Sequence, residues 1–401
     1  MKKNSAILIF ATVLVLLASA CTGAAPKNDN AIQTLAVQTL TAVALTESAA
    51  ATPTNKPSDT PVPTATPEPT QEKTDIGPDN FPEDVNPLTG EKSEDPALLK
   101  RRPVMVKVSN FPVEGRPHAG LSSADMVFAY AMPGMMSRYI GLYYGKDANL
   151  IGPVRSVRLI DPELVQLYQG ILGGSGGDQE NVLPKVARLL GNRVVYEGLC
   201  PGICDDGHHW VTTVFGDSAA ITKYITQRGD EQKKYDLTGT LFDKKAPEGG
   251  KPTSKLSFNF SMADKSDWTY DEATGKYLRW IDNAPNYNEM IPLVDRVTEK
   301  QLAFSNVIII EAKYSWYNSD LYLTDMLGNT DGLKATFLRD GKLYEGTWKV
   351  TDPNKPIQFF DAQGHLFPLK PGNTWVNISG VNTEYGMDGD VPVINFKEPG
   401  F

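Results

Sequence analysis

The sequence predicts an α+β protein in which a mixed α/β domain at 86–240 precedes a β-rich domain at 241–401. In the first of these stretches, short apolar runs alternate with segments of helical periodicity, an order typical of mixed sheets covered by helices. In the second, apolar and polar residues alternate between Gly-containing turns, which is typical of antiparallel hairpins. The hydrophobic fraction of 41% over 401 residues is sufficient for a packed core.

Strands and helices of the α/β domain are predicted from local signals. Three apolar runs predict strands, at 104–108, 125–130 and 139–144. Three further segments predict helices, at 161–167, 181–190 and 217–227. Asp161 followed by Pro162 is a good start signal for the first helix, because Pro needs no hydrogen-bond acceptor in the first turn.

The β-rich domain is predicted from runs of alternating residues and their turns. Strands or hairpins are expected at 256–260, 268–280, 306–311, 335–350, 357–369 and 374–378. Asp340-Gly341 is the strongest hairpin turn, since this pair adopts the backbone angles of a tight turn easily. The many Trp and Tyr residues here could stack on a carbohydrate, but aromatic residues favour strands, so we expect most of them to pack within the sheets.

The first residues are typical of a bacterial lipoprotein signal peptide at 1–20. Lys2 and Lys3 precede an apolar run at 6–17, and the small residues at 18–20 lead to Cys21. We expect Cys21 to carry the lipid that anchors the mature chain outside the cytoplasm, on the bacterial cell membrane. No later segment approaches 18 uninterrupted apolar residues, so no second membrane span is predicted.

A disordered linker is predicted at 21–85, rich in Ala, Thr and Pro. Pro and Thr alternate in TPTNKPSDTPVPTATPEPTQ, and Pro favours an extended chain without hydrogen bonds. This tract is therefore expected to hold the folded part away from the membrane. The net charge of −9 disfavours nucleic acid as a partner, and no cofactor is expected.

A Gly-Pro-Val-Arg-Ser-Val-Arg segment and a glycine-rich segment point to an anion site. Arg155 and Arg158 carry the forked donors suited to carboxylate or phosphate. Gly173, Gly174 and Ser175 precede the predicted helix at 181–190, and backbone N–H groups at such a position can approach an anion. The alternative is that the glycines form a connection and the arginines pair with Asp125 or Asp161. The segment matches neither a P-loop nor a dinucleotide fingerprint.

Cys200 and Cys204 form a C-x3-C pair, for which a disulfide is the preferred interpretation outside the cytoplasm. A zinc site with His208 and His209 is an alternative that lacks the usual C-x2-C spacing, and free thiols remain a third. No metal site is predicted.

A weaker hypothesis is catalysis. Ser175 is the candidate nucleophile, His209 the candidate base, and Asp125, Asp178 and Asp206 are candidate acids. The surrounding Gly-Gly-Ser-Gly-Gly is not the G-x-S-x-G elbow, because no clear strand precedes the Ser.

From residue 86 to about residue 380 the chain resembles the YerB-type lipoproteins, bacterial proteins built from two adjacent domains of unknown function. The motifs that carry the resemblance are Asn86-Pro87-Leu88-Thr89-Gly90, Arg116-Pro117, Ser137-Arg138, Gly152-Pro153-Val154-Arg155-Ser156, Gly173-Gly174-Ser175, Trp348-Lys349 and Thr374-Trp375. The chain departs from the family pattern at Ala129, Pro133 and Ile171. The resemblance implies an envelope lipoprotein and adds Arg138 to the candidate ligand-binding residues; it implies no reaction.

Together these signals predict an envelope lipoprotein that binds an anionic polymer of the cell envelope, or an envelope protein, through the Arg/Gly segments. The alternative is a hydrolase or transferase acting on cell-wall or phosphodiester substrates with Ser175 and His209.

Overall fold

Twelve strands from both predicted domains form one mixed sheet in the computed structural model, which describes residues 74–207 and 212–400. Cys21, the predicted signal peptide and His209 lie outside the described residues. The sheet order is β10-β19-β18-β16-β21-β3-β4-β2-β5-β6, with β17 paired to β16 and β20 to β19. These strands are β2 (Val104–Ser109), β3 (Met126–Met132), β4 (Met136–Tyr143), β5 (Ile171–Gly174), β6 (Val194–Tyr196), β10 (Lys251–Pro252), β16 (Asn306–Asn318), β17 (Leu321–Asp325), β18 (Leu333–Arg339), β19 (Lys342–Lys349), β20 (Gln358–Asp361) and β21 (Thr374–Gly380).

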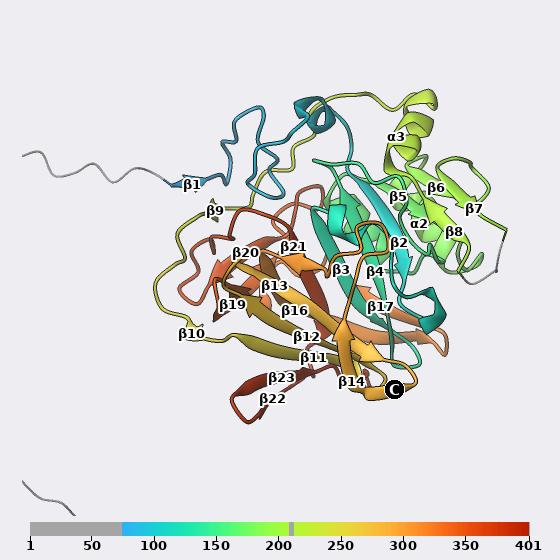
Figure 1. Cartoon of the computed structure of the whole chain (residues 1–401). Helices are drawn as coiled ribbons and strands as arrows, with labels where there is room; N and C mark the ends of the chain where they lie inside the picture. Colours follow the sequence, from blue (N-terminus) through green and yellow to red (C-terminus); the bar gives the residue numbers. More distant parts are fainter. Residues whose placement is uncertain (1–73, 208–211, 401) are drawn as a thin grey trace, which may run out of the picture. The chain divides into compact units, whose positions relative to one another are not determined.

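A second sheet of seven strands comes entirely from the C-terminal half, with the order β14-β13-β12-β11-β23-β22 and β15 paired to β13. Its strands are β11 (Lys255–Ser261), β12 (Asp264–Asp271), β13 (Lys276–Asn283), β14 (Asn286–Pro292), β15 (Ala303–Phe304), β22 (Glu384–Asp388) and β23 (Val391–Asn395). Two small sheets pair β1 (Asp75–Ile76) with β9 (Phe242–Asp243), and β7 (Ile203–Asp205) with β8 (Val214–Gly216). Figure 1 shows the arrangement of these strands.

Three α-helices form where the sequence predicts them. They are α1 (Asp161–Leu167), α2 (Val182–Leu190) and α3 (Ser218–Gln227), and three short 3-10 turns lie at η1 (Pro96–Lys100), η2 (Val113–Gly115) and η3 (Leu121–Ser123). Helix α3 begins after Asp217, whose carboxylate accepts a hydrogen bond from the Ala220 N–H at 2.9 Å. None of the described helices is long and apolar enough to cross a membrane.

The two predicted domains share the large sheet, because β21 of the C-terminal half pairs in parallel with β3 of the N-terminal half. Trp375 lies opposite Val127 in this pairing. Both hydrophobic cores also contain residues from both halves, for example Phe128 with Ile308 in one and Val106 with Trp375 in the other. The α+β description holds coarsely, in a chain that is mostly β-sheet.

The end of the predicted linker needs a correction. Residues 74–85, assigned to the linker from the sequence, lie against the C-terminal half: β1 pairs with β9, and Val85 is buried. The Pro/Thr tract ends before these residues, and Phe81 packs edge-on against Phe242 with ring centroids 6.3 Å apart. Apolar side chains within this stretch therefore have a hydrophobic partner that the local composition does not reveal.

Seven strands of the large sheet point the same way: β19, which the antiparallel β18 separates from β16, and six strands between β16 and β6. β16, β21 and β3 are mutually parallel, β4 is antiparallel to both β3 and β2, and β2, β5 and β6 are parallel. Their C-terminal ends therefore meet along one side of the sheet, which we call the carboxyl edge. In open sheets of this kind, ligands commonly bind beyond such an edge.

Candidate functional site

Five of the six candidate ligand-binding residues, together with Lys107, lie near the carboxyl edge. Arg138, at the start of β4, lies opposite Ser109 of β2 and Tyr130 of β3. The segment that carries Arg155 and Arg158 crosses the strand ends: the Arg155 N–H donates to the Lys107 carbonyl at 3.3 Å.

Ser175 and the glycines follow from β5. The Ser175 N–H donates to the Arg155 carbonyl at 3.1 Å, so the serine lies beside the arginine segment. Its side chain is half-buried. Gly174, the last residue of β5, is the fifth candidate residue near the carboxyl edge. Gly173 lies on the other face of the sheet, toward Ile203 and Ile221.

The arginines form a cluster of like charge. Burial, together with the charges of Arg155 and Arg158, lowers the pKa of Arg138 to about 9. Burial also lowers the pKa of Arg155 and of Arg158, with Arg158 acting on Arg155 in the same direction. Three mutually repelling cations in a partly dehydrated place favour a bound anion.

Two arginines of this cluster, Arg138 and Arg158, have donors that the described residues use only in part. No described carboxylate lies within 4.0 Å of the guanidinium of Arg138 or Arg158. The Arg138 Nη1 donates to the carbonyl of its neighbour Ser137 at 3.1 Å. The buried Nε of Arg158 has no partner among the described residues. An oxyanion would satisfy such donors.

Acidic groups near the cluster partly balance its charge. Asp161, Asp178 and Asp320 favour the charged form of Arg158, and Glu197 does the same for Arg155. Asp320 belongs to the C-terminal half, in the turn between β16 and β17. The site is thus built from both halves of the chain.

A buried polar group beneath the arginines was missed from the sequence. Lys107, on β2, is fully buried; its Nζ lies 3.2 Å from Asp161 Oδ1 and 3.9 Å above the ring of Tyr130. The Tyr130 hydroxyl donates to the same carboxylate oxygen, and Asp161 Oδ2 accepts the Arg158 N–H at 2.7 Å. The signal that could have found it is a Lys inside the apolar run Val104–Val108.

Burial dominates the electrostatics of this group. It lowers the pKa of Lys107 to about 7, opposed by the charge of Asp161, and it raises the pKa of Asp161. Asp161 connects the lysine to the backbone of Arg158, so the pair positions the arginine segment.

Gly173 and Gly174 have a packing role that differs from the predicted approach to an anion. A Cβ on Gly174 would lie 2.7 Å from Val157 Cγ1, and one on Gly173 would lie 3.2 Å from Ile203 Cδ1. The Gly174 position therefore lets the arginine segment lie directly against the end of β5.

The start of α2 does not offer the free N–H groups expected from the sequence. The Asp178 carboxylate accepts the N–H groups of Glu180 at 3.2 Å and Asn181 at 2.6 Å, and these hydrogen bonds lower the pKa of Asp178. The chain thus supplies its own anion there, and the arginines remain the candidate anion ligands.

Asp125 does not join the site. It precedes β3, whereas Ser175 follows the C-terminal end of β5, so the two lie at opposite edges of the sheet. The Asp125 carboxylate accepts the N–H groups of Tyr144 and Gly145 at 2.6 and 2.9 Å, and burial raises its pKa to about 6. This network contradicts a catalytic role beside Ser175 and indicates a structural one.

The sulfur atoms of Cys200, in the loop after β6, and Cys204, in β7, are bonded, and the two Cα atoms are 5.1 Å apart. Within residues 74–207 and 212–400, no three His, Cys, Asp or Glu side chains are grouped to hold a metal ion.

The cavity at the carboxyl edge is small, about 10 Å³, with room for about one water molecule. It is lined by Tyr130 and Arg158 from the N-terminal half and by Tyr322 and Thr324 from the C-terminal half. Any larger ligand must therefore contact the arginines from the open side.

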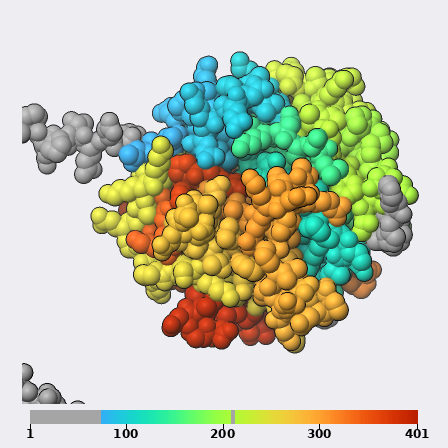
Figure 2. Space-filling view, in the orientation of Figure 1, coloured from blue at the N-terminus to red at the C-terminus, as the bar shows by residue number. Residues whose placement is uncertain are grey.

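A larger groove of about 780 Å³ lies elsewhere, between the loop at η2 and the β13–β14 hairpin. Figure 2 shows the cyan surface of the first segment beside the orange surface of the second. Its arginine, Arg116, is already paired with Asp282 at 2.9 Å and donates to Asn110 Oδ1 at 3.1 Å. We therefore favour the arginine cluster over this groove as the anion site.

Comparisons with known proteins agree with this fold. The model described as "Protein of unknown function (DUF3048) N-terminal domain" matches residues 88–197, and its C-terminal counterpart matches 256–376. The "Putative lipoprotein YerB" of Bacillus subtilis (strain 168) is 26% identical over 327 residues, which are 77% of this chain and 89% of the relative. A crystal structure of the YerB protein from Bacillus subtilis has a TM-score of 0.62 at 24% identity and covers 73% of this chain and 96% of that chain; this likeness concerns the fold alone.

Proposed function

Because the chain carries both DUF3048 domains and is homologous to YerB, we propose that it is an envelope lipoprotein that binds an anionic envelope ligand. Arg138, Arg155 and Arg158 are the proposed ligand-binding residues, with Ser175 beside them. The observation that carries the proposal is that Arg138 and Arg158 lie at the carboxyl edge with no described carboxylate within 4.0 Å of either guanidinium.

The proposed ligand presents a carboxylate or phosphate from the open side of the site. The forked donors of arginine match either group. Lys107 does not contact this ligand: it is fully buried and engaged with Asp161. Its role is to hold Asp161, which in turn holds the Arg158 backbone.

Binding of polyphosphate, a chain of phosphates without sugar, tests the proposal. In isothermal titration, Arg138→Gln and Arg158→Gln should each weaken binding at least about tenfold, because each removes a charge-assisted contact. Arg228→Gln is the matched control, since this exposed arginine of the α3 end contacts Tyr224 and lies outside the site. Equal effects of all three substitutions would reduce the proposal to unspecific charge attraction and reject it.

The anchor is proposed from the signal-like N-terminus and agrees with the name of the homologue. Cys21→Ser should move the protein from the membrane fraction to the soluble fraction. Retention of the variant in the membrane fraction would contradict lipidation at this residue.

A hydrolase or transferase is the second candidate, favoured by one observation. Ser175, the candidate nucleophile, is half-buried and lies beside the arginine segment, where its N–H donates to the Arg155 carbonyl at 3.1 Å. Release of phosphate from polyphosphate by the wild type, lost in Ser175→Ala with binding intact, would support this candidate. Absence of turnover with tight binding would leave the binding function alone.

A further inference from the structure

A groove of about 450 Å³ opens between α2 and the β16–β17 hairpin. Its walls include Leu159, which directly follows Arg158, and Leu323 of β17. Leu159 connects the groove to the arginine segment along the chain, and the groove, like the proposed anion site, is formed by both halves of the chain. Its volume falls within the range of roughly 300–1,000 Å³ found for clefts that hold small ligands.

An exposed aromatic ring stands in this groove. Tyr317 is 50% exposed, whereas Trp268, Trp348 and Trp375 are fully buried. The Tyr317 hydroxyl donates to Asn181 Oδ1 at 3.3 Å, a hydrogen bond that joins the hairpin to the start of α2 and restrains the ring. Restrained, exposed tyrosines are suited to stacking against a flat apolar face with a wet rim.

The polar groups of the groove suit a ligand that both donates and accepts hydrogen bonds. Glu180 supplies an acceptor and the exposed Arg188 a donor, while Lys185 is paired with Glu163. The groove contains side chains of both charges, whereas the arginine cluster is positive, so the groove is less suited to a small inorganic anion. Sugar rings combine an apolar face with hydroxyl groups that donate and accept.

We propose that this groove binds a sugar ring of an acidic polysaccharide whose carboxylate or phosphate lies at Arg158. The proposal rests on the proposed anion-binding function and narrows it to glycopolymers. Tyr317 stacks on the ring, and Arg188 and Glu180 bind its hydroxyl groups.

Two polymers separate the sugar contribution from the charge contribution: polygalacturonate, which has sugar and carboxylate, and polyphosphate, which has only the charge. Each is titrated into the wild type, Tyr317→Ala, Tyr317→Phe and Arg158→Gln. Tyr317→Ala should weaken polygalacturonate binding about tenfold, the order expected for loss of a stacking contact, and leave polyphosphate binding within about twofold. Tyr317→Phe should retain polygalacturonate binding, since the ring remains. Arg158→Gln should weaken both.

If Tyr317→Ala weakens binding of both polymers equally, or weakens binding of neither, the proposal that the groove binds a sugar ring is overturned. Wild-type binding of polyphosphate but not polygalacturonate overturns it too, while the anion site survives. If Arg158→Gln changes neither polymer, the anion site itself fails, which is a separate result. Unfolding by urea verifies that the Tyr317 variants are folded, as expected for a half-exposed side chain.

Discussion

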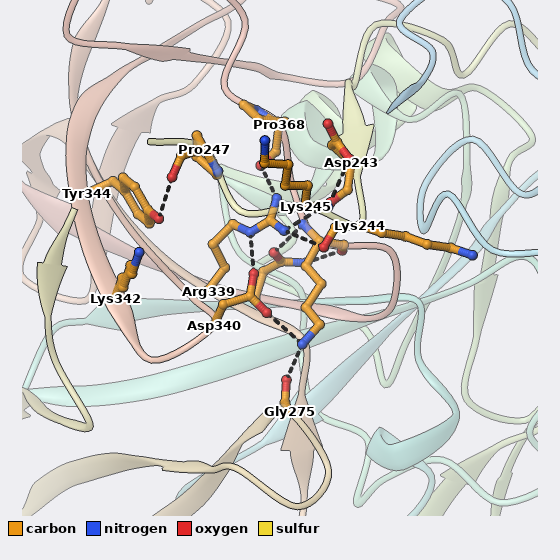
Figure 3. A network of polar contacts seen from close by, with 12 residues as sticks. Asp243, Lys244, Lys245, Pro247, Gly275, Arg339, Asp340, Lys342, Tyr344 and Pro368 are labelled. Carbon is orange, nitrogen blue, oxygen red and sulfur yellow. Dashed lines mark hydrogen bonds and ion pairs between the residues drawn. The ribbon is translucent and has the colours of Figure 1, made fainter. Parts of the chain in front are cut away.

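Arg339 and Arg138 are both buried arginines, but their surroundings differ. Arg339 is fully buried, and its guanidinium donates to Asp340 Oδ2 at 2.8 Å, to the Pro368 carbonyl at 2.7 Å and to the Asp243 carbonyl at 2.9 Å. Figure 3 shows these contacts converging from separate segments. Arg138 instead donates to its neighbour Ser137 and faces two other arginines.

The Arg339 network is complete within the chain. Asp340 Oδ1 pairs with Lys370 at 2.7 Å, and the Lys370 Nζ donates to the Gly275 carbonyl at 2.7 Å, so positive and negative groups alternate (Figure 3). A saturated network of this kind stabilises the fold. Arg138 and Arg158 have no described carboxylate within 4.0 Å of their guanidinium groups, and this difference from Arg339 is the reason we propose them as ligand-binding residues.

The largest expected effect is on the saturated side. Arg339→Met should lower the free energy of unfolding by about 4 kcal/mol, because it removes the donors of at least three buried hydrogen bonds. Urea unfolding measures this loss, with Arg228→Gln as an exposed control expected to change stability by less than about 0.5 kcal/mol. A loss below about 1 kcal/mol would show that the network is not structural.

Lys107→Met comes next, with an expected loss of about 3 kcal/mol, because Asp161 would be left buried without its cation. The double variant Lys107→Met/Asp161→Asn should recover part of that loss, since both charges are gone. A double variant as unstable as the sum of the two single variants would contradict the pairing.

A pH effect is expected from Asp264, an acidic neighbour of Arg138. Burial raises its pKa to about 6, so the folded chain holds a proton between pH 3.8 and 6 that the unfolded chain has released. Its stabilising effect is complete below pH 3.8 and is lost as the pH rises through 6. In the wild type, this group should lower the free energy of unfolding by about 2 kcal/mol between pH 4 and 7. Asp264→Asn should not show this decline, because its side chain does not titrate. Parallel pH profiles for the two proteins would refute this.

The smallest stability effect is expected for Arg138→Gln. Removing one of three repelling charges should change the free energy of unfolding by less than about 1 kcal/mol, while it weakens anion binding. Thermal unfolding of this variant beside Arg339→Met sharpens the comparison directly. A loss as large as that of Arg339→Met would make Arg138 a structural residue.

Local signals in the sequence predicted local structure well. Asp161-Pro162 predicted α1 at its observed bounds, and Asp217 predicted the start of α3. The pairing of β3 with β21 could not be predicted in this way, because it joins segments almost 250 residues apart with no local mark.

The site was predicted only in part, because some of its residues carry a local sequence signal and others do not. Arg155 and Arg158 stand in one motif, whereas the sequence around Lys107 reads simply as an apolar strand. The packing role of Gly174 against Val157, and the cap that Asp178 places on α2, depend on contacts visible only in three dimensions.

The position of a bound heavy oxyanion tests most directly whether the arginines at the carboxyl edge hold an anion. Crystals of the full chain with Cys21→Ser are soaked in tungstate, and the anomalous signal locates the ion. We expect a peak within hydrogen-bond distance of the guanidinium groups of Arg138, Arg155 and Arg158, and we expect excess phosphate to displace it. A tungstate ion found only at other surfaces, with these arginines unoccupied, would contradict the proposal.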